Sequence, residues 1–186
     1  MRSSSGFTVR GSRGFAVSVK FGLPPIARDD VALFILGSLP GDASLAAARY
    51  YAHPTNQFWR LVGTVISEEL HSLDYEARLA RLADHRIGLW DVVAFAERRG
   101  SLDQAIRGAG HNAIDQLAMD FPCLRAIAFN GGAASKAGRR LIGDPAGLAL
   151  LDLPSSSAAN TMPFAAKAQI WARLAEFIPA AQSDGR

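Results

Sequence analysis

Residues 31–59, VALFILGSLPGDASLAAARYYAHPTNQFW, decide the fold of this chain. The stretch begins with six apolar residues, 31–36, a run short enough and rich enough in branched side chains to predict a strand buried on both faces. A turn built from glycine and proline, residues 37–41, follows at the carboxyl end of that strand. Because open α/β sheets bind their ligands at the carboxyl ends of their strands, we expect a site at this turn.

A dense group of rings and hydrogen-bonding side chains lies on the connection from this turn to a helix predicted from Phe58 onward. Its members are Tyr50, Tyr51, His53, Asn56, Phe58 and Trp59. A planar slot between rings, with an amide and backbone NH groups at its edge, is what a flipped nucleobase requires. The alternative is that the rings are core residues, which we expect of Trp59. We expect Tyr51 and Asn56 to line the pocket, since polar groups beside such a turn need hydrogen-bond partners.

The rest of the chain alternates between strands and helices. Apolar runs predict three further strands, at residues 87–93, 124–129 and 148–153. Helical repeats are found between them and after the last one, whereas residues 94–112 are expected to form a polar loop. This alternation predicts an α/β fold of three layers (α/β/α), with a mainly parallel four-stranded sheet covered on both faces. The strand tips at residues 37–41, 91–95, 130–132 and 154–160 should then converge at one edge.

Three of these tips carry polar side chains. Asp91 stands near the end of an apolar strand, where an ionised carboxylate is costly unless it is hydrogen-bonded or lies over a pocket. Its alternative role is structural, as an acceptor for backbone NH groups. Asn130 opens an Asn-Gly-Gly turn that lacks the lysine and serine or threonine of a phosphate-binding loop. Ser155, Ser156 and Ser157 follow the last strand, where serines are also common as mere capping residues.

Composition limits the classes of protein that remain. The 186 residues, 49% hydrophobic and 20% charged, suit one domain, expected at residues 21–180, between a basic arm at 1–20 and a short tail at 181–186. The single cysteine excludes an intrachain disulfide, and the four histidines lack metal-site spacing, so we expect neither a metal nor a cofactor. Without an apolar run of about 18 residues, the chain is expected to be cytoplasmic and not membrane-bound.

Two segments together resemble the uracil-DNA glycosylase superfamily. The sequence GSLPG at 37–41, followed by YAHPTNQFW at 51–59, is similar to its first signature, closest to the mismatch-specific and hypoxanthine-DNA glycosylase branches. The sequence LPSSSAAN at 153–160 resembles its DNA-engaging loop. The resemblance spans about residues 21–177. It implies the same α/β architecture and a monomeric DNA repair enzyme of base excision repair, whose partner is DNA containing a deaminated base.

The resemblance also implies roles for individual residues. Its base pocket would be formed by Gly37, Ser38, Tyr51, His53, Asp91 and Asn130, and its DNA-binding loop by Ser155, Ser156, Ser157 and Asn160. Many members carry Asp or Asn two residues after the first glycine of the turn, to activate the attacking water. Here that residue is Leu39, so the catalytic role passes to Asn56, as in the hypoxanthine branch. That branch tends to have histidine where this chain has Asn160.

The expected function is therefore a monofunctional DNA glycosylase (a hydrolase) that flips out uracil, hypoxanthine or both and hydrolyses the N-glycosidic bond. Neither segment contains a lysine that could form a Schiff base with the sugar, so lyase activity is not expected. Two alternatives stay open at this point. One is a catalytically weak protein of the same fold that binds lesions or abasic sites, and the other is an α/β protein that acts on free nucleosides.

Overall fold

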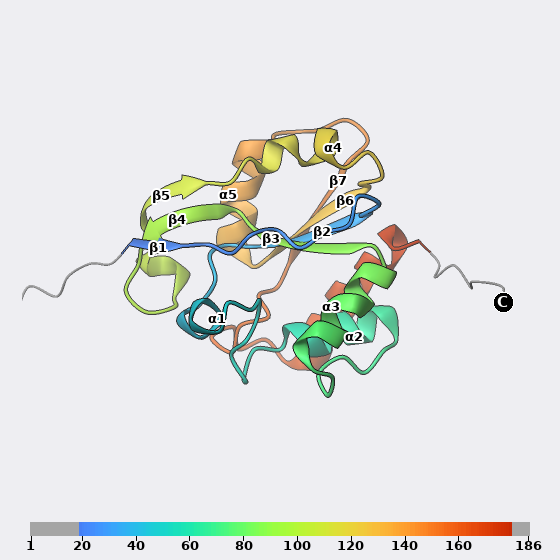
Figure 1. Cartoon of the computed structure of the whole chain (residues 1–186), viewed down its shortest axis with the longest axis horizontal. Coiled ribbons are helices and arrows are strands. Elements are labelled where there is room, and N and C mark those ends of the chain that lie inside the picture. The colour runs from blue at the N-terminus through green and yellow to red at the C-terminus, as the bar shows by residue number, and fades with distance from the viewer. Residues whose placement is uncertain (1–18, 180–186) are drawn as a thin grey trace, which may run out of the picture.

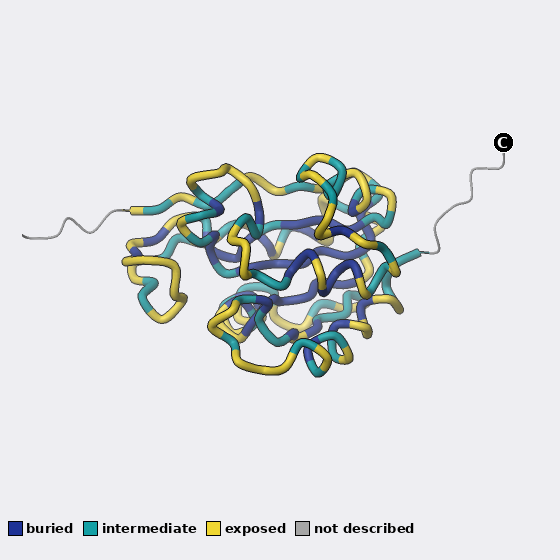
Figure 2. The backbone as a smooth tube through the Cα atoms, turned by 90° about the horizontal axis from the view of Figure 1, so that it is seen from below, coloured by how far each residue is buried: buried dark blue, intermediate teal, exposed yellow. Residues whose placement is uncertain are grey.

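Four parallel strands form the centre of the protein, which we describe from a computed structural model covering residues 19–179. They lie in the order β3-β2-β6-β7. Their bounds are β2 (Leu33–Gly37), β3 (Ile87–Asp91), β6 (Ala126–Asn130) and β7 (Ala149–Leu153). Every residue of β2 and β6 is buried, as expected for strands covered on both faces. Figure 2 shows these strands as a buried centre surrounded by exposed loops.

Helices cover both faces of the sheet, because successive side chains of a strand point to opposite sides (Figure 1). Leu33 and Ile35 of β2 pack under α2 (Phe58–Ile66), α3 (Tyr75–Asp84), α6 (Phe164–Trp171) and the 3-10 helix η3 (Ala172–Phe177). Phe34 and Leu36 pack under η2 (Ile114–Gln116), α4 (Leu117–Asp120) and α5 (Gly132–Ile142). The predicted three-layer α/β/α fold is confirmed.

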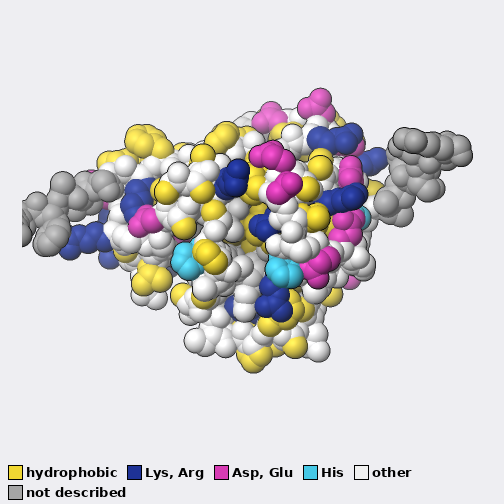
Figure 3. Space-filling view, turned by 60° about the horizontal axis from the view of Figure 1, so that its bottom comes forward, with side chains coloured by type: hydrophobic (Ala, Val, Ile, Leu, Met, Phe, Trp, Pro, Cys, Tyr) yellow, Lys and Arg dark blue, Asp and Glu magenta, His cyan; other side chains and the backbone are white. Residues whose placement is uncertain are grey.

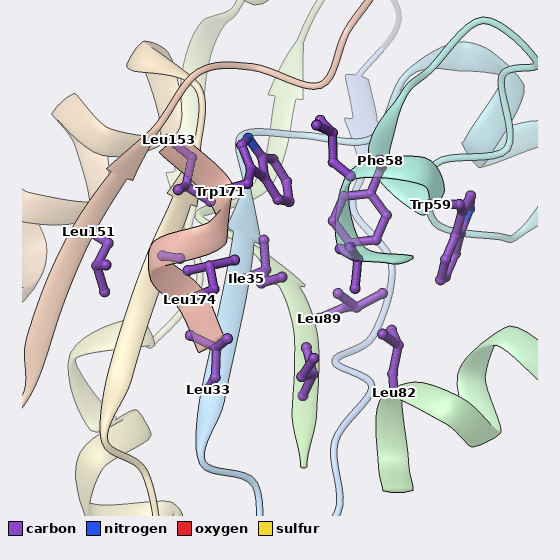
Figure 4. Packing of buried hydrophobic residues seen from close by; sticks show 14 of the residues in the cluster. Leu33, Ile35, Phe58, Trp59, Leu82, Leu89, Leu151, Leu153, Trp171 and Leu174 are labelled. Atoms are coloured by element: carbon purple, nitrogen blue, oxygen red, sulfur yellow. The ribbon is translucent and has the colours of Figure 1, made fainter. Parts of the chain in front are cut away.

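The larger core lies between the sheet and the α2, α3 and α6 layer (Figure 4). Trp171 and Leu174 point toward Ile35 and Leu33, and Phe58 packs edge-on against Trp171 with ring centroids 5.8 Å apart. Trp59, only 3% exposed, belongs to this core, as the sequence predicted. These contacts fix the start of α2 against the sheet, and with it the loop that precedes α2.

The prediction of a polar loop at residues 94–112 is wrong, because this segment contains most of β4 and all of β5, two strands of a second sheet. This sheet is antiparallel, in the order β1-β4-β5, with β1 (Val19–Phe21), β4 (Val93–Glu97) and β5 (Arg107–His111). The strand β5, RGAGH, has no apolar alternation to reveal it. After it, only the short elements η2 and α4 precede β6. Strand β1 begins inside the range predicted for the arm; the rest of that arm and the tail lie outside the described residues.

Two short helices complete the described chain. Helix α1 (Asp42–Ala47) follows the turn after β2, and the 3-10 helix η1 (Asp103–Ala105) lies between β4 and β5. Among residues 19–179, none of the helices combines the length and the apolar character needed to cross a membrane.

Candidate active site

A cavity of about 400 Å³ lies at the carboxyl edge of the parallel sheet. All four strand tips reach it, as the sequence predicted, although only Asp91 of the tip at 91–95 is in its lining. The ring-rich loop contributes Tyr50, Tyr51, His53, Thr55 and Asn56. Residues 101–104, which the sequence did not single out, form the remaining side. The volume is within the ~300–1,000 Å³ range that small-molecule sites occupy.

The deepest part of the cavity consists of Gly37, Tyr51 and Asp91, which we call the floor. Gly37 pairs with Asp91 across the parallel ladder of β2 and β3. A Cβ atom on Gly37 would lie 2.5 Å from Asp91 Oδ1 and 3.3 Å from Tyr51 Oη, so only glycine leaves these two groups in place. Tyr51 Oη and Asp91 Oδ2 are buried without a hydrogen-bond partner among the described residues. Because buried polar atoms are nearly always paired, this arrangement suits a ligand that bonds to both.

Asp91 is 3% exposed, and burial raises its pKa to about 7. The hydroxyl of Tyr50 and the guanidinium of Arg98 act in the opposite direction, and the charge of Asp103 adds to the rise. Asp91 therefore retains its proton over much of the range below neutral pH, when it can donate a hydrogen bond as well as accept one. Its backbone carbonyl accepts a bond of 2.8 Å from Asn112 Nδ2. The structure places Asp91 at the strand end, and its role in reading a base stays a prediction.

Tyr51 lies parallel to Phe58, with ring centroids 3.7 Å apart and an interplanar angle of 8°. One face of the Tyr51 ring is thus covered by a core residue. Its backbone has φ +52°, a left-handed conformation that costs about 1–3 kcal/mol in a residue other than glycine. The neighbouring Tyr50 is 2% exposed, and its hydroxyl lies 3.1 Å from the carbonyl oxygens of Leu23 and Pro24.

Asn56 lies at the start of α2 and also in the cavity lining. Its Oδ1 accepts a hydrogen bond of 2.9 Å from the backbone NH of Phe58, so it satisfies one of the free NH groups of the helix. His53 is exposed, and its Nδ1 lies 2.9 Å from Thr55 Oγ1. The amide oxygen of Asn56 has a second lone pair, so the observed bond is compatible with either a cap or a water-holding group.

Asn130 fastens the loop after β7 to the sheet. Its Nδ2 donates to Ser156 Oγ at 2.9 Å, and its Oδ1 accepts from the NH of Ser156 at 2.8 Å. The carbonyl of Ser156 in turn accepts from the NH of Gln57 at 2.9 Å. Ser156 is 1% exposed, and its hydroxyl is bonded to Asn130. Both Asn130 and Ser156 still border the cavity.

Lys167, completely buried on α6, links the loop before α2 to the loop after β7. Its Nζ donates to Gln57 Oε1 at 2.9 Å and to the carbonyl of Asn160 at 2.9 Å. Desolvation lowers the pKa of its ammonium. We call residues 53–57 and 154–160 the loop wall. Within it, the hydroxyls of Ser155 and Ser157 accept bonds from nearby backbone NH groups, as does Asn160 Oδ1.

The opposite side of the cavity is formed by residues 101–104, the middle of the segment 98–106 that we call the strap. Arg98, 1% exposed, donates to the carbonyl oxygens of Leu39 and Pro40 from below the turn. Leu39 itself is buried in a small apolar cluster with Val93 and Ala96. From the exposed side of the strap, Asp103 Oδ1 accepts a bond of 2.5 Å from Ser38 Oγ.

Three functional candidates were missed by reasoning from the sequence: Arg98, Asp103 and Lys167. The sequence contained a signal for Lys167, since it lies three residues after Phe164 and four before Trp171, on the inward face of the helix. Arg98 and Asp103 both stand in the segment expected to be a polar loop, where neither follows a periodic pattern. Their positions depend on the second sheet.

Charge on the surface is mixed. On the face drawn in Figure 3, Lys and Arg side chains alternate with Asp and Glu and do not form one basic stripe. Within residues 19–179, no group of three or more His, Cys, Asp or Glu side chains is arranged to hold a metal ion.

Comparison with known proteins agrees with this geometry. The model of the uracil DNA glycosylase superfamily matches residues 24–175. A hypoxanthine DNA glycosylase from Methanosarcina acetivorans is 42% identical over 142 residues, covering 76% of this chain and 89% of the relative. Another, from Methanosarcina barkeri, is 43% identical over 112 residues, covering 60% and 71%. The solution NMR structure of a Methanosarcina acetivorans protein, for which uracil DNA glycosylase is the proposed identity, has a TM-score of 0.76 at 39% identity, covering 85% of this chain and 97% of that one.

Proposed function

This chain belongs to the uracil DNA glycosylase superfamily, and we propose that it excises hypoxanthine or uracil from DNA. The family model covers most of the chain, and two relatives named hypoxanthine DNA glycosylase are more than 40% identical to it. The chain is accordingly a DNA glycosylase that acts on N-glycosyl bonds in DNA. The identity of the excised base and the route by which that base reaches the site are our proposal.

The observation that carries this proposal is the pair of unpartnered polar atoms on the floor, Tyr51 Oη and Asp91 Oδ2. Hypoxanthine and uracil both present an NH group next to a carbonyl oxygen, so each offers a donor and an acceptor to these two atoms. Inside a duplex that edge is occupied by base pairing, so the base must be rotated out to reach the floor. Stacking on the open face of Tyr51, at ~1–3 kcal/mol per base, is the alternative to a bond from its hydroxyl, because a base stacked on this ring cannot also present its edge to Oη.

Hydrolysis then requires a water at C1′ of the sugar. As the bond to the base breaks, the sugar gains oxocarbenium character and the base leaves with the electron pair. Backbone NH groups of the turn at residues 37–41 would stabilise that negative charge. Asn56 would orient the water through its amide oxygen. The described residues that line the cavity include no lysine, which favours hydrolysis without a Schiff base.

Duplex oligonucleotides test the proposal directly. We expect strand breakage after alkali treatment of a duplex with a single hypoxanthine or a single uracil, and none with the undamaged duplex of the same sequence. Retention of the damaged duplex without breakage would instead indicate a lesion-binding protein. Absence of both binding and breakage would reject DNA repair and direct attention to free nucleosides.

A further inference from the structure

The proposed hydrolysis leaves one proton without a destination. A water that bonds to C1′ must lose a proton, and the neutral amide of Asn56 can orient the water but cannot take that proton. The position where the resemblance implies Asp or Asn is Leu39, which is 5% exposed and packed among apolar side chains. The first signature therefore contains no carboxylate directed at the cavity from that position.

The strap brings a carboxylate to the same turn from 65 residues later in the chain. Asp103 lies in the cavity lining, and its Oδ1 accepts from Ser38, the residue immediately before Leu39. The strap is held over the turn at three more points. Ser101 Oγ accepts from the NH of Asp42 at 2.9 Å, Lys20 Nζ donates to the carbonyl of Gly100 at 2.8 Å, and Arg98 donates to the carbonyl of Leu39 at 2.9 Å. Asp103 thus has a fixed position, and of its two carboxylate oxygens only Oδ1 is hydrogen-bonded among residues 19–179.

An acidic residue at this position weakens DNA binding. We therefore expect it to have a function that compensates for the weaker binding. An exposed carboxylate carries a negative charge at neutral pH and repels the phosphates of an approaching duplex. The same charge attracts a sugar that is becoming an oxocarbenium ion, as carboxylates do in enzymes that cleave other glycosidic bonds. The charge of Asp103 reaches the floor, since it raises the pKa of both Asp91 and Tyr51.

We propose that Asp103 is a catalytic residue of this site, the carboxylate that accepts the proton of the attacking water. This inference rests on the proposed function. The water oxygen bonds to C1′, the C1′–N bond breaks with its electron pair going to the base, and one water proton goes to Asp103. The departing base takes a proton from Asp91. The two carboxyl groups then exchange protons with solvent and return to their initial states, so the net reaction adds one water.

The surroundings of the two carboxyl groups favour these opposite roles. Burial raises the pKa of Asp91 to about 7, so near neutral pH a substantial share of it holds the proton to be donated. The titratable and charged groups that act on it are Tyr50, Tyr51, Arg98 and Asp103. A buried carboxyl group that keeps its proton, facing an exposed carboxylate across one cavity, suits an acid–base pair.

Single-turnover excision by Asp103→Asn tests the proposal, with Asp120→Asn, an exposed acid on α4 outside the cavity lining, as the matched control. We expect a fall of at least about 100-fold for Asp103→Asn, with unchanged or tighter DNA binding because a repulsive charge is removed. Asp103→Glu should recover part of the rate, and Asp120→Asn should keep the parent's rate.

Several results would overturn this role. Excision by Asp103→Asn at the parent's rate would remove Asp103 from the chemistry, and a rate loss fully explained by weaker DNA binding would make it a binding residue. Ser38→Ala offers a second probe, since it releases Asp103 without altering the carboxylate, and we expect a fall of roughly 10-fold at saturating DNA. Failure of the proposed function is distinguishable, because the parent protein itself would then be inactive on both duplexes.

Discussion

The floor of the cavity and its loop wall differ in what their buried polar atoms contact. The polar groups of the loop wall are paired with buried side chains behind it: Ser156 bonds both ends of the Asn130 amide, and Gln57 and Asn160 accept from Lys167. On the floor, Tyr51 Oη and Asp91 Oδ2 are buried without a partner among the described residues. An unpaired buried polar atom costs about 1–3 kcal/mol of folding stability. The floor therefore lowers the stability of the fold, whereas the paired atoms of the loop wall do not. Substitutions in the loop wall should therefore destabilise the fold, and substitutions on the floor should mainly affect the substrate.

Asn56 is expected to break the rule that loop-wall substitutions affect stability alone. It lies in the loop wall, and it is also our candidate for orienting water. We expect Asn56→Ala to lower the single-turnover excision rate by about 100- to 1,000-fold, as removal of one oriented active-site group does. Loss of its bond to the NH of Phe58 should cost a further, separate 0.5–2 kcal/mol or so of stability. The two effects are separated by measuring the rate of folded enzyme and the thermal midpoint on the same sample.

Asn56→Asp is the matched control for that experiment, since a carboxylate keeps an oxygen for both Phe58 and the water. If Asn56→Ala melts lower but excises both bases at the parent's rate, Asn56 is a helix cap only. The catalytic group would then be sought at Asp91 or His53, or at Asp103 as inferred above.

Asp91→Asn should change how stability depends on pH. The folded-state pKa of about 7 exceeds the value of about 3.9 in unfolded chains, so the folded state binds the extra proton between these limits. The parent's unfolding free energy should consequently fall as pH rises from about 4 to 7, by at most roughly 4 kcal/mol from this group. Asp91→Asn should lack this fall and exceed the parent's stability at pH 8. Urea unfolding at pH 5 and pH 8 measures both; an identical pH dependence in the two proteins would refute the assignment.

Much of this division was not visible in the sequence. The parallel strands were, because strands buried on both faces consist of continuous apolar runs, such as those of β2 and β6. Their tips could also be placed at one edge, since parallel strands end on the same side. The second sheet escaped prediction because β5 is a glycine-rich edge strand whose pairing with β4 is irregular. Because the strap connects β4 to β5, its position could not be predicted either, nor could the contact of Asp103 with Ser38.

Side-chain roles were predictable only in part. Tyr51, Asn56 and Asp91 were singled out from their type and their place next to turns, and all three line the cavity. Local sequence could not indicate that Ser156 would be buried by Asn130, which lies 26 residues away, or that Arg98 would support the turn at residues 37–41. Those partners are brought together by the fold. The predicted contacts of Ser155, Ser156, Ser157 and Asn160 with DNA stay predictions.

Lys167→Met tests the loop wall itself. The substitution removes a buried ammonium and leaves Gln57 Oε1 and the carbonyl of Asn160 without their donor. We expect a loss of about 1–3 kcal/mol in unfolding free energy and weaker binding to product DNA, since the loop wall is freed from α6. The matched control is Lys136→Met, an exposed lysine on α5 that should change neither quantity measurably. Equal stability of the two variants would contradict the claim that buried pairing holds this wall.

The smallest effect is expected on the floor, from Tyr51→Phe. This change deletes a buried hydroxyl that has no partner among the described residues and keeps the ring that lies on Phe58. The fold should therefore lose no stability and gain up to about 1 kcal/mol, because an unsatisfied polar atom is removed.

If Tyr51 acts on the base by stacking, Tyr51→Phe also keeps most of the excision, whereas Tyr51→Ala loses ~1–3 kcal/mol of base affinity, about 5- to 150-fold. Urea unfolding and single-turnover excision on both duplexes give the two quantities. Equal excision losses in the two variants would assign the role to the hydroxyl, and a stability loss in Tyr51→Phe would mean that the floor is held together like the loop wall.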